Sequence, residues 1–144
     1  NLYNYPPMRH FNKDSHDYAF VDKLEAGLAL SGSDVKSLRT QTVQFANSKI
    51  DIIDGVPYIE NLHIPVYKYS QGQIIDISRS RPLLLKAKEI AKLQSYRHQK
   101  YALIPIAIFL SGKWFKVEIG IGKKIKKYEK REKIKAREFQ RGKI

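Results

Sequence analysis

Residues 103–121 read LIPIAIFLSGKWFKVEIGI, and this stretch decides the fold. Residues 103–110 are a continuous apolar run, Ser111 and Gly112 follow as a two-residue turn, and residues 113–121 alternate strictly. Because successive side chains of a strand point to opposite faces of a sheet, the alternation predicts an antiparallel hairpin with one covered face. The side chains expected on one face are those of Phe115, Val117, Ile119 and Ile121. Those expected on the other face are Trp114, Lys116, Glu118 and Gly120.

Further strands are predicted on the N-terminal side of this hairpin. Residues 18–30 carry aromatic and aliphatic side chains at near-alternate positions, which indicates a strand. Residues 50–60 indicate a second hairpin, because Asp54 and Gly55 form a pair that readily takes the positive φ angles of a tight turn.

Two helices are predicted from capping residues and apolar spacing. Ser33 can cap a short helix that runs through Arg39, since a serine hydroxyl satisfies free amides at a helix start. Pro82 suits a first helical turn, where its missing N–H costs nothing, and the apolar residues after it repeat at helical spacing as far as Tyr96.

These elements predict a mainly β fold: one small closed antiparallel β-barrel with helices packed at its openings. Closing the sheet removes the exposed edges that an open sheet of about six strands has to protect. A length of 144 residues allows one domain. We expect an irregular N-terminal arm over residues 1–15, the barrel over residues 16–122 and a basic C-terminal tail over residues 123–144.

The charge balance points to a polyanionic partner. Lys plus Arg number 27 against 14 Asp plus Glu, a net charge of +13, which favours nucleic acid first and an anionic membrane second. The last twenty-two residues hold 11 of the Lys and Arg and 3 Glu, so they carry +8 of that total. The tail has no apolar stripe; it is predicted either to be partly disordered in water or to fold when RNA phosphates neutralise it.

Composition also excludes several classes of protein and site. Cysteine is absent, which removes disulfides, zinc fingers and iron–sulfur clusters, and no run of eighteen apolar residues could span a membrane. The chain begins with Asn1 and its first methionine is Met8, which indicates either that a leader segment was removed or that the sequence begins mid-chain.

No catalytic centre can be assembled from the sequence. The four histidines, at positions 10, 16, 63 and 98, lack metal-ligand spacing on one predicted element. His16 adjoins Asp17, but neighbours on a strand point to opposite faces. Gly120 and Gly122 precede two lysines without the helix of a phosphate-binding loop. We therefore predict a binding protein rather than an enzyme, with no cofactor and no metal.

Basic and aromatic side chains sketch an RNA-binding surface. Lys36 and Arg39 lie on the first predicted helix, and Arg79 and Arg81 stand just before the second. Trp114 and Lys116 share a strand face. Basic groups neutralise phosphates, and exposed aromatic rings stack on unpaired bases. Considered singly, each basic residue is best interpreted as a solvated surface charge, and Trp114 as part of a second small core. Considered together, on a chain of this net charge, these residues favour RNA binding.

Four blocks of sequence carry a resemblance to one family. HDYAFVDKLEAGLALSGSDVKSLR, residues 16–39, resembles the signature of the small protein B (SmpB) family. NLHI at residues 61–64, RSRPLLLKAKEI at residues 79–90, and WFKVEIGIGKK through EKRE at residues 114–132 resemble its later blocks in the same order.

The resemblance implies a fold, a function and a set of partners. The fold is an OB-like β-barrel with two to three flanking α-helices. The function is to bind the tRNA-like domain of tmRNA (SsrA RNA), to aid its charging with alanine, and to bring it with an elongation factor Tu complex to stalled ribosomes for trans-translation. The tail is implied to occupy the decoding centre, on small-subunit ribosomal RNA, and the empty mRNA channel. We expect a monomer without membrane contact, in the cytoplasm of a bacterium, or in the stroma of a plastid-type organelle if a leader was removed.

The resemblance also implies site residues. Glu25, Leu84 and Lys116 fall at positions associated with tmRNA binding. Neighbouring matched blocks add His16, Lys36, Arg39 and Asn61. The tail residues implied to contact the ribosome are Lys123, Lys124, Tyr128, Glu129, Lys130 and Arg131. The Glu25 carboxylate can accept hydrogen bonds from base amino groups or orient a neighbouring cation, with a purely structural role at a strand end as the alternative.

The chain departs from the family pattern in two places. Ser33-Asp34-Val35 stands where the family has Thr-Glu-Val, which shortens the acid. Gly122-Lys123-Lys124 is followed by four residues before Glu129-Lys130-Arg131, where the family has two, so either two residues are inserted or the glycine position is lost. Alternative functions are a structural ribosomal protein and a general RNA-binding module.

Overall fold

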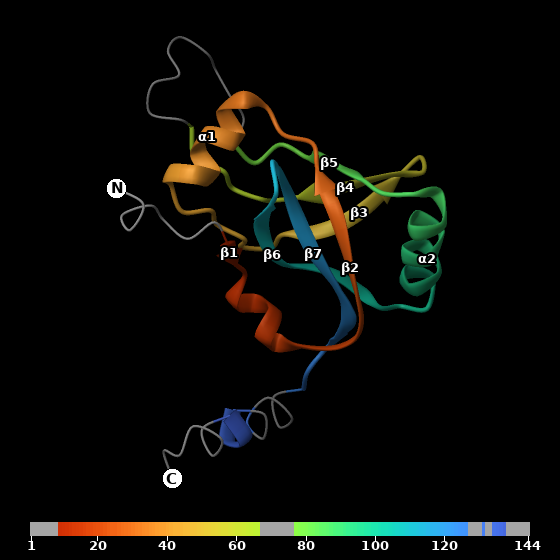
Figure 1. Ribbon diagram of the computed structural model, residues 1–144. Coiled ribbons are helices and arrows are strands. Elements are labelled where there is room, and N and C mark those ends of the chain that lie inside the picture. Colours follow the sequence, from red (N-terminus) through yellow and green to blue (C-terminus); the bar gives the residue numbers. More distant parts are fainter. Residues whose placement is uncertain (1–8, 67–76, 127–130, 132–133, 138–144) are drawn as a thin grey trace.

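The strands and helices come from a computed structural model, which describes residues 9–66, 77–126, 131 and 134–137 (Figure 1). Its strands are β1 (Arg9–Phe11), β2 (Tyr18–Leu28), β3 (Lys49–Ile53), β4 (Val56–Glu60), β5 (Arg81–Leu84), β6 (Ala102–Ser111) and β7 (Trp114–Lys124). Its helices are the 3-10 helix η2 (Lys13–Asp17) and the α-helices α1 (Gly32–Thr40) and α2 (Ala87–His98).

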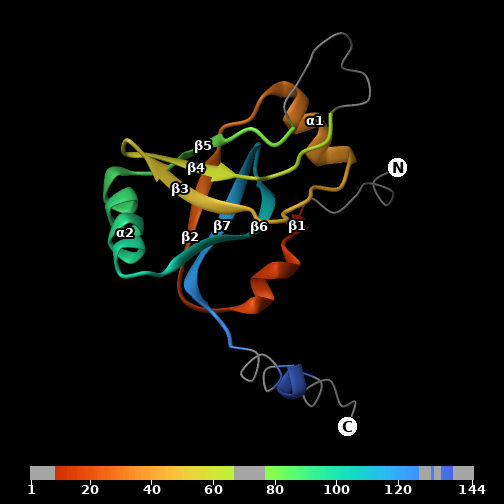
Figure 2. The ribbon, with the colours of Figure 1, turned by 180° about the vertical axis from the view of Figure 1, so that it is seen from behind.

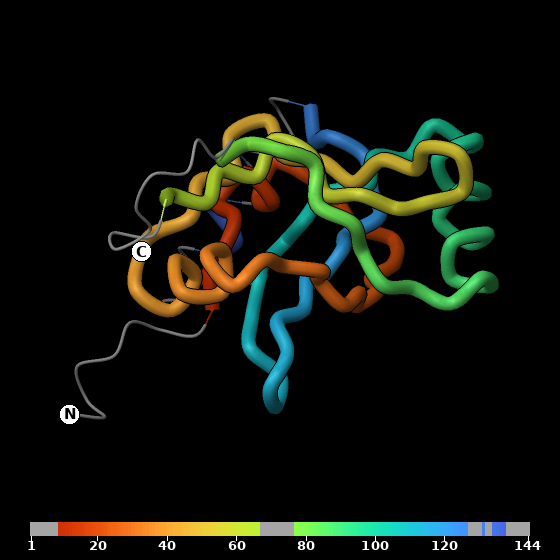
Figure 3. Tube along the Cα trace, turned by 90° about the horizontal axis from the view of Figure 1, so that it is seen from above, coloured from red at the N-terminus to blue at the C-terminus, as the bar shows by residue number. Residues whose placement is uncertain are grey.

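All seven strands belong to one antiparallel sheet, in the order β1-β6-β7-β2-β5-β4-β3. The inner face of the sheet holds the core, and its largest fully buried aliphatic side chains include Leu38, Ile59, Leu62, Ile64, Leu93, Ile108, Ile119 and Ile121. The views from behind and from above place α1 at one side of the sheet and α2, with the β3–β4 hairpin, at the other (Figures 2 and 3). The mainly β architecture with flanking helices is thus confirmed.

The sheet is curled but its hydrogen-bonded ladder is not closed. β1 and β3 are its two edges, and in the part of the chain that the structure describes they are not paired with each other. β3 instead lies close to β6 without being paired to it. Closure of the barrel, which the sequence predicts, is therefore not confirmed.

The clearest error of the sequence prediction concerns Pro82. This residue lies in β5, opposite Tyr58 of β4, and not in a first helical turn. Its carbonyl accepts a hydrogen bond from the Ala29 N–H at 3.0 Å. An apolar run this short fits a strand or a helix equally well, and pairing with strands on both sides decides for the strand. Helix α2 begins only at Ala87. Its N-cap residue is Lys86, whose backbone N–H donates a hydrogen bond to the Glu89 carboxylate at 2.8 Å.

Two smaller boundaries also differ from prediction. Ser31 rather than Ser33 caps α1, accepting from the Asp34 N–H at 3.1 Å. Ser111 pairs with Trp114, so the β6–β7 turn is Gly112 and Lys113. The expected turn at Asp54 and Gly55 is confirmed, with φ angles of 51° and 78°.

The N-terminal segment is more regular than predicted. Residues 9–17, most of which we expected in an irregular arm, form β1 and η2. β1 pairs with β6, and the buried Asn12 continues the contact: its backbone N–H donates to the Ile106 carbonyl at 2.8 Å and its side chain to the Pro105 carbonyl at 2.8 Å. Three residues are too few to show alternation, so β1 could not be predicted from its sequence.

Helix α2 is attached to the sheet by polar contacts with two strands. Asp22 of β2 accepts a hydrogen bond from the Tyr96 hydroxyl at 3.0 Å and forms an ion pair with Lys92 at 2.9 Å. Arg97 forms an ion pair with Asp51 of β3. Among the described residues, no helix is both long enough and apolar enough to cross a bilayer.

Candidate nucleic-acid interface

Three side-chain positions form a row across the outward face of the sheet. Gly27 of β2 pairs with Leu84 of β5 on one side and with Lys116 of β7 on the other. A Cβ atom at Gly27 would lie 3.2 Å from the Leu84 Cβ, so the glycine leaves room for the leucine. The row continues through Phe109 of β6 to Arg9 of β1, whose guanidinium carbon lies 5.8 Å from the Phe109 ring centroid. A strip of apolar and basic groups therefore crosses five strands.

Glu25 lies on the same face, two residues before Gly27 on β2. Its cross-strand partner is Glu118, and Lys116 is its diagonal neighbour. The structure thus brings Glu25, Leu84 and Lys116 together, although they come from three strands that are distant in sequence. A carboxylate next to this basic strip can accept hydrogen bonds from base amino groups.

Trp114 extends this surface at the tip of the β6–β7 hairpin, which projects from the body (Figure 3). Trp114 lies two residues before Lys116 on β7 and is 75% exposed. Leu84 is 66% exposed. The alternative that Trp114 belongs to a second small core is therefore wrong.

An open pocket of about 410 Å³ lies between this hairpin tip and α1. Its lining residues are Leu28, Ala29, Leu30, Val35, Leu84, Lys113, Trp114 and Phe115. The lining is apolar except for Lys113. A surface of this kind offers an aromatic stacking platform beside a cation, which is how proteins hold unpaired nucleotides.

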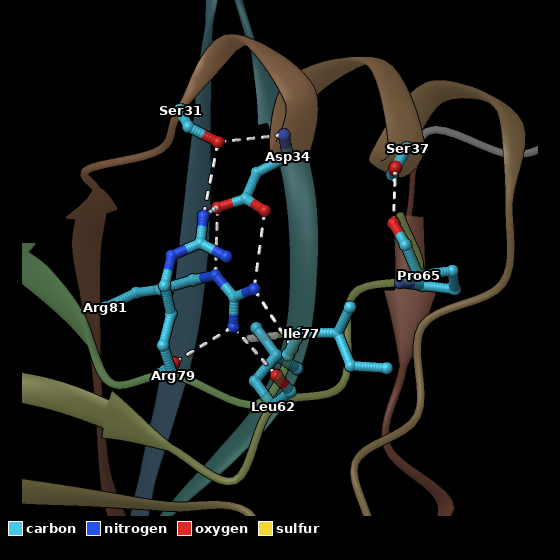
Figure 4. Close-up of polar contacts among 8 residues, drawn as sticks. All are labelled: Ser31, Asp34, Ser37, Leu62, Pro65, Ile77, Arg79 and Arg81. Atoms are coloured by element: carbon cyan, nitrogen blue, oxygen red, sulfur yellow. Dashed lines mark hydrogen bonds and ion pairs between the residues drawn. The ribbon is translucent and has the colours of Figure 1, made fainter. Parts of the chain in front are cut away.

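The start of α1 is tied to β5 by a buried ion pair (Figure 4). The Arg81 Nε donates to the Asp34 carboxylate at 2.9 Å, and its terminal nitrogens donate to Asp34 at 3.3 Å and to the backbone carbonyls of Leu62, Arg79 and Ile77 at 2.8, 3.1 and 3.1 Å. These five bonds use all five N–H donors of the guanidinium. Arg81 is only 1% exposed.

Arg81 must therefore be withdrawn from the predicted RNA contacts, since its donors are all engaged inside the protein. Arg79 differs, because its side chain keeps 33% exposure while it donates to Asp34 at 2.6 Å and to the Ser31 hydroxyl at 3.2 Å. It is held at the surface beside the start of α1. Lys36 and Arg39 lie on α1 and are exposed.

Two predicted residues lie away from this row. His16, in η2, is exposed, with its ring 5.2 Å from that of Phe11 and its Nδ1 3.4 Å from an Arg137 terminal nitrogen. Asn61 follows β4 with a φ of 57°, and its side-chain amide donates to the Asn47 carbonyl at 3.1 Å. The structure thus does not bring His16 or Asn61 to the Leu84–Lys116 row.

The tail leaves the sheet at the end opposite Trp114. Lys123 and Lys124 belong to β7, and both are exposed. A Cβ at Gly122 would collide with the Ala19 carbonyl oxygen, so β2 and β7 approach closely where the strand ends. Arg131 is helical, whereas Tyr128, Glu129 and Lys130 lie outside the described residues.

Sequence reasoning missed several members of the surface. Arg9 was missed because β1 was not predicted, and Val35 because nothing in the sequence shows that α1 faces the hairpin tip. Lys113 is placed at the rim of the pocket only because the turn is shifted by one residue. The alternation of residues 113–121 did correctly separate outward Trp114 and Lys116 from buried Phe115 and Val117.

Comparison with known proteins gives consistent matches over most of the chain. The sequence model described as SmpB protein matches residues 9–143. The SsrA-binding protein of Lactobacillus johnsonii is 41% identical over 130 residues, covering 90% of this chain and 86% of the relative. That of Geobacillus kaustophilus is 39% identical over 130 residues, covering 90% and 84%. A solved structure described as "tmRNA-SmpB: a journey to the center of the bacterial ribosome" matches with a TM-score of 0.70 at 35% identity, covering 83% of this chain and 86% of that chain.

Proposed function

The chain belongs to the SmpB family, and on that premise we propose that it binds the tRNA-like domain of tmRNA and delivers it to stalled ribosomes for trans-translation. The observation that carries this proposal is the Leu84–Gly27–Lys116 row with exposed Trp114 beside it. Exposed apolar groups next to lysines suit a folded RNA with unpaired bases better than a uniform duplex.

The roles of the surface residues follow from their chemistry. Phosphates are neutralised by Lys116 and by Lys36 and Arg39 of α1. Arg79 is paired with Asp34, and the exposed part of its side chain faces the RNA. Leu84 and Trp114 contact bases, and Glu25 accepts hydrogen bonds from base amino groups. Recognition therefore combines charge with base contacts, which a purely electrostatic surface lacks.

The position of the tail supports a second role at the other end of the molecule. β7 runs over eleven residues from Trp114 to Lys124, so its two ends lie about 33 Å apart at 3.3 Å a residue. Lys123, Lys124 and Arg131 thus lie far from the Trp114 end and contact ribosomal RNA, together with Tyr128, Glu129 and Lys130, in the decoding centre and mRNA channel. His16 lies at this tail end and contributes there rather than at the Trp114 end.

The remaining partners follow from the same pathway. The protein acts as a monomer, with an elongation factor Tu complex carrying the charged tmRNA, and Asn61 forms a peripheral contact. It acts in the bacterial cytoplasm, where ribosomes stall, since the relatives named above are bacterial. The plastid stroma is the alternative compartment. An OB-like closed arrangement of the sheet is part of this proposal, with β3 and β6 as the strands that meet.

The test compares affinity for the tRNA-like domain of a bacterial tmRNA with affinity for an elongator tRNA, at physiological salt with competitor RNA. Any protein with a net charge of +13 binds RNA in low salt, so the comparison matters more than the affinity itself. We expect a preference for the tRNA-like domain that Glu25→Ala and Lys116→Ala reduce. Lys88→Ala, on the exposed side of α2, is the matched control and should leave it intact.

The alternatives give different results. Equal binding to both RNAs would contradict the proposal and favour a general RNA-binding module. A fixed one-to-one presence in purified ribosomes lacking tmRNA would favour a structural ribosomal protein.

A further inference from the structure

We infer that the pocket between the β6–β7 hairpin tip and α1 holds one unpaired nucleobase of the bound RNA, stacked on the Trp114 indole. The inference rests on the proposed function, because it names how that RNA is read at one point. It adds a defined subsite, with two walls, a floor and a cationic rim.

The first step is that the two most exposed large apolar side chains of the described residues meet at this pocket. Trp114 is 75% exposed and Leu84 66%. Keeping two such side chains in water opposes folding, and exposed apolar patches commonly mark binding sites. The backbone of each residue is held by strand pairing. Trp114 pairs with Ser111 directly after the turn, and Leu84 pairs with Gly27.

The second step is the shape of the pocket. Leu28 and Phe115, which are 7% and 4% exposed, form the floor, and Val35 of α1 stands opposite the hairpin tip. About 410 Å³ of open volume lies within the range of small-molecule sites, enough for a purine or pyrimidine ring. A flat ring between an indole and aliphatic side chains is a common mode of single-strand recognition.

The third step is charge, which selects the occupant. Lys113 lies at the rim, and Lys116 follows on the outward face of β7. The nearby acid of α1, Asp34, is buried and neutralised by Arg81 and Arg79. A phosphate on either side of a bound base therefore meets cations. The same rim disfavours a second copy of this strongly basic chain, because two positive surfaces repel.

The fourth step is preorganisation. The buried Asp34–Arg81 pair holds the start of α1 against β5, so the wall that carries Val35 is in place before RNA arrives (Figure 4). A wall that is already fixed loses little conformational entropy on binding, which favours affinity.

The experiment uses Trp114 as its own reporter, because it is the only tryptophan in the chain. The full-length protein is titrated with the tRNA-like domain while tryptophan emission and its quenching by acrylamide are followed, and binding is measured separately with labelled RNA. We expect quenching that saturates at the same dissociation constant as binding, and protection from acrylamide. Trp114→Ala should weaken binding about 5- to 150-fold, the range of one base–aromatic stack, and Trp114→Phe by less.

Two controls separate stacking from charge and from folding. Val21→Ala truncates another highly exposed apolar side chain, 60% exposed, outside the pocket and should leave affinity unchanged. A short single-stranded adenosine pentamer should quench Trp114, whereas an abasic pentamer with the same number of phosphates should not.

RNA that binds with unchanged Trp114 emission, unchanged acrylamide quenching and no effect of Trp114→Ala would overturn the base pocket while leaving the proposed function standing. Emission that changes with protein concentration alone would assign the pocket to a second copy and also overturn it. Loss of preference for the tRNA-like domain in the unmodified protein would instead overturn the proposed function.

Discussion

Glu25 and Glu118 lie directly opposite each other on neighbouring strands, β2 and β7, on the outward face of the sheet. Like charges in this arrangement repel and destabilise a sheet. Lys116 is the diagonal neighbour of Glu25, and Lys23, which pairs with Gly120, is the diagonal neighbour of Glu118. A pair of acids thus sits between two lysines in a protein that otherwise attracts polyanions.

Glu118→Gln should stabilise the protein. Removing one charge of the opposed pair is expected to increase the free energy of unfolding by about 0.2–1 kcal/mol at low salt, since it relieves repulsion with Glu25. Thermal unfolding at low and high salt measures this, and the gain should shrink as salt screens the charges. Glu60→Gln is the matched control with the opposite sign, because Glu60 faces Lys49 across β3 and β4. A loss of stability in Glu118→Gln would contradict the repulsion.

Gly27→Ala should damage the RNA surface more than a comparable glycine substitution elsewhere. The added methyl lies 3.2 Å from the Leu84 Cβ, so Leu84 must move, and we expect a cost of about 1–2 kcal/mol together with weaker binding of the tRNA-like domain. Gly32→Ala, at the start of α1, meets nothing within 4 Å and should be neutral or stabilising by about 0.4–1 kcal/mol. Urea unfolding and RNA titration of both variants provide the measurement; equal behaviour would refute the role of Gly27.

Asp34→Ala should be among the most destabilising single substitutions of an acid in this chain. It leaves Arg81 buried and charged without its carboxylate, a situation that typically costs about 3–5 kcal/mol. Asp51→Ala, which breaks the more exposed pair with Arg97, should cost only about 0–1 kcal/mol. Chemical denaturation of the two variants tests the contrast, and a loss in Asp34→Ala no larger than in Asp51→Ala would count against the buried pair.

The attachment of α2 to β2 should weaken in acid. The hydrogen bond from Lys92, with those from the Lys23 backbone and the Tyr96 hydroxyl, lowers the pKa of the Asp22 carboxyl in the folded protein. A carboxyl with a lowered pKa stabilises the fold above its unfolded pKa of about 3.9, and this stabilisation is lost as the pH falls through the folded value. The difference in Tm between the unmodified protein and Asp22→Asn should therefore be largest near neutral pH and vanish in strong acid.

Lys92→Met provides the partner measurement for Asp22. It removes the strongest cause of the lowered pKa, so it should abolish most of the same pH-dependent difference. Tyr96→Phe should remove a smaller part. A Tm difference between the unmodified protein and Asp22→Asn that is constant across the pH range would contradict the assignment.

Arg79 and Arg81 show where sequence reading reaches its limit. They are two residues apart and look alike in sequence, yet one is partly exposed and the other is fully buried. Alternation could not have separated them, because residues two apart in an extended chain point to the same side. Arg81 is buried because its guanidinium binds Asp34 and three backbone carbonyls, which no local sequence pattern shows. The β6–β7 hairpin was predictable because its apolar period extends over many residues, whereas β1 was too short to show any period.

The function was predictable from short blocks rather than from geometry. Glu25, Leu84 and Lys116 could be named individually, but only the register through Gly27 shows that they lie on one face. The pocket could not be predicted, since it depends on the packing of α1 against a hairpin tip some eighty residues further along the chain.

The uninterrupted pairing of β7 from Trp114 to Lys124 also limits how this protein can change its length during evolution. Inserting or deleting one residue within the strand would turn every later side chain to the other face, exposing the core positions and burying the lysines. Residues added beyond Lys124, where pairing with β2 ends at Tyr18, carry no such penalty. The four residues that separate Lys124 from Glu129 lie beyond that point. The tail can therefore diverge in length between relatives while the distance and orientation between the RNA-reading end and the point of tail departure stay the same.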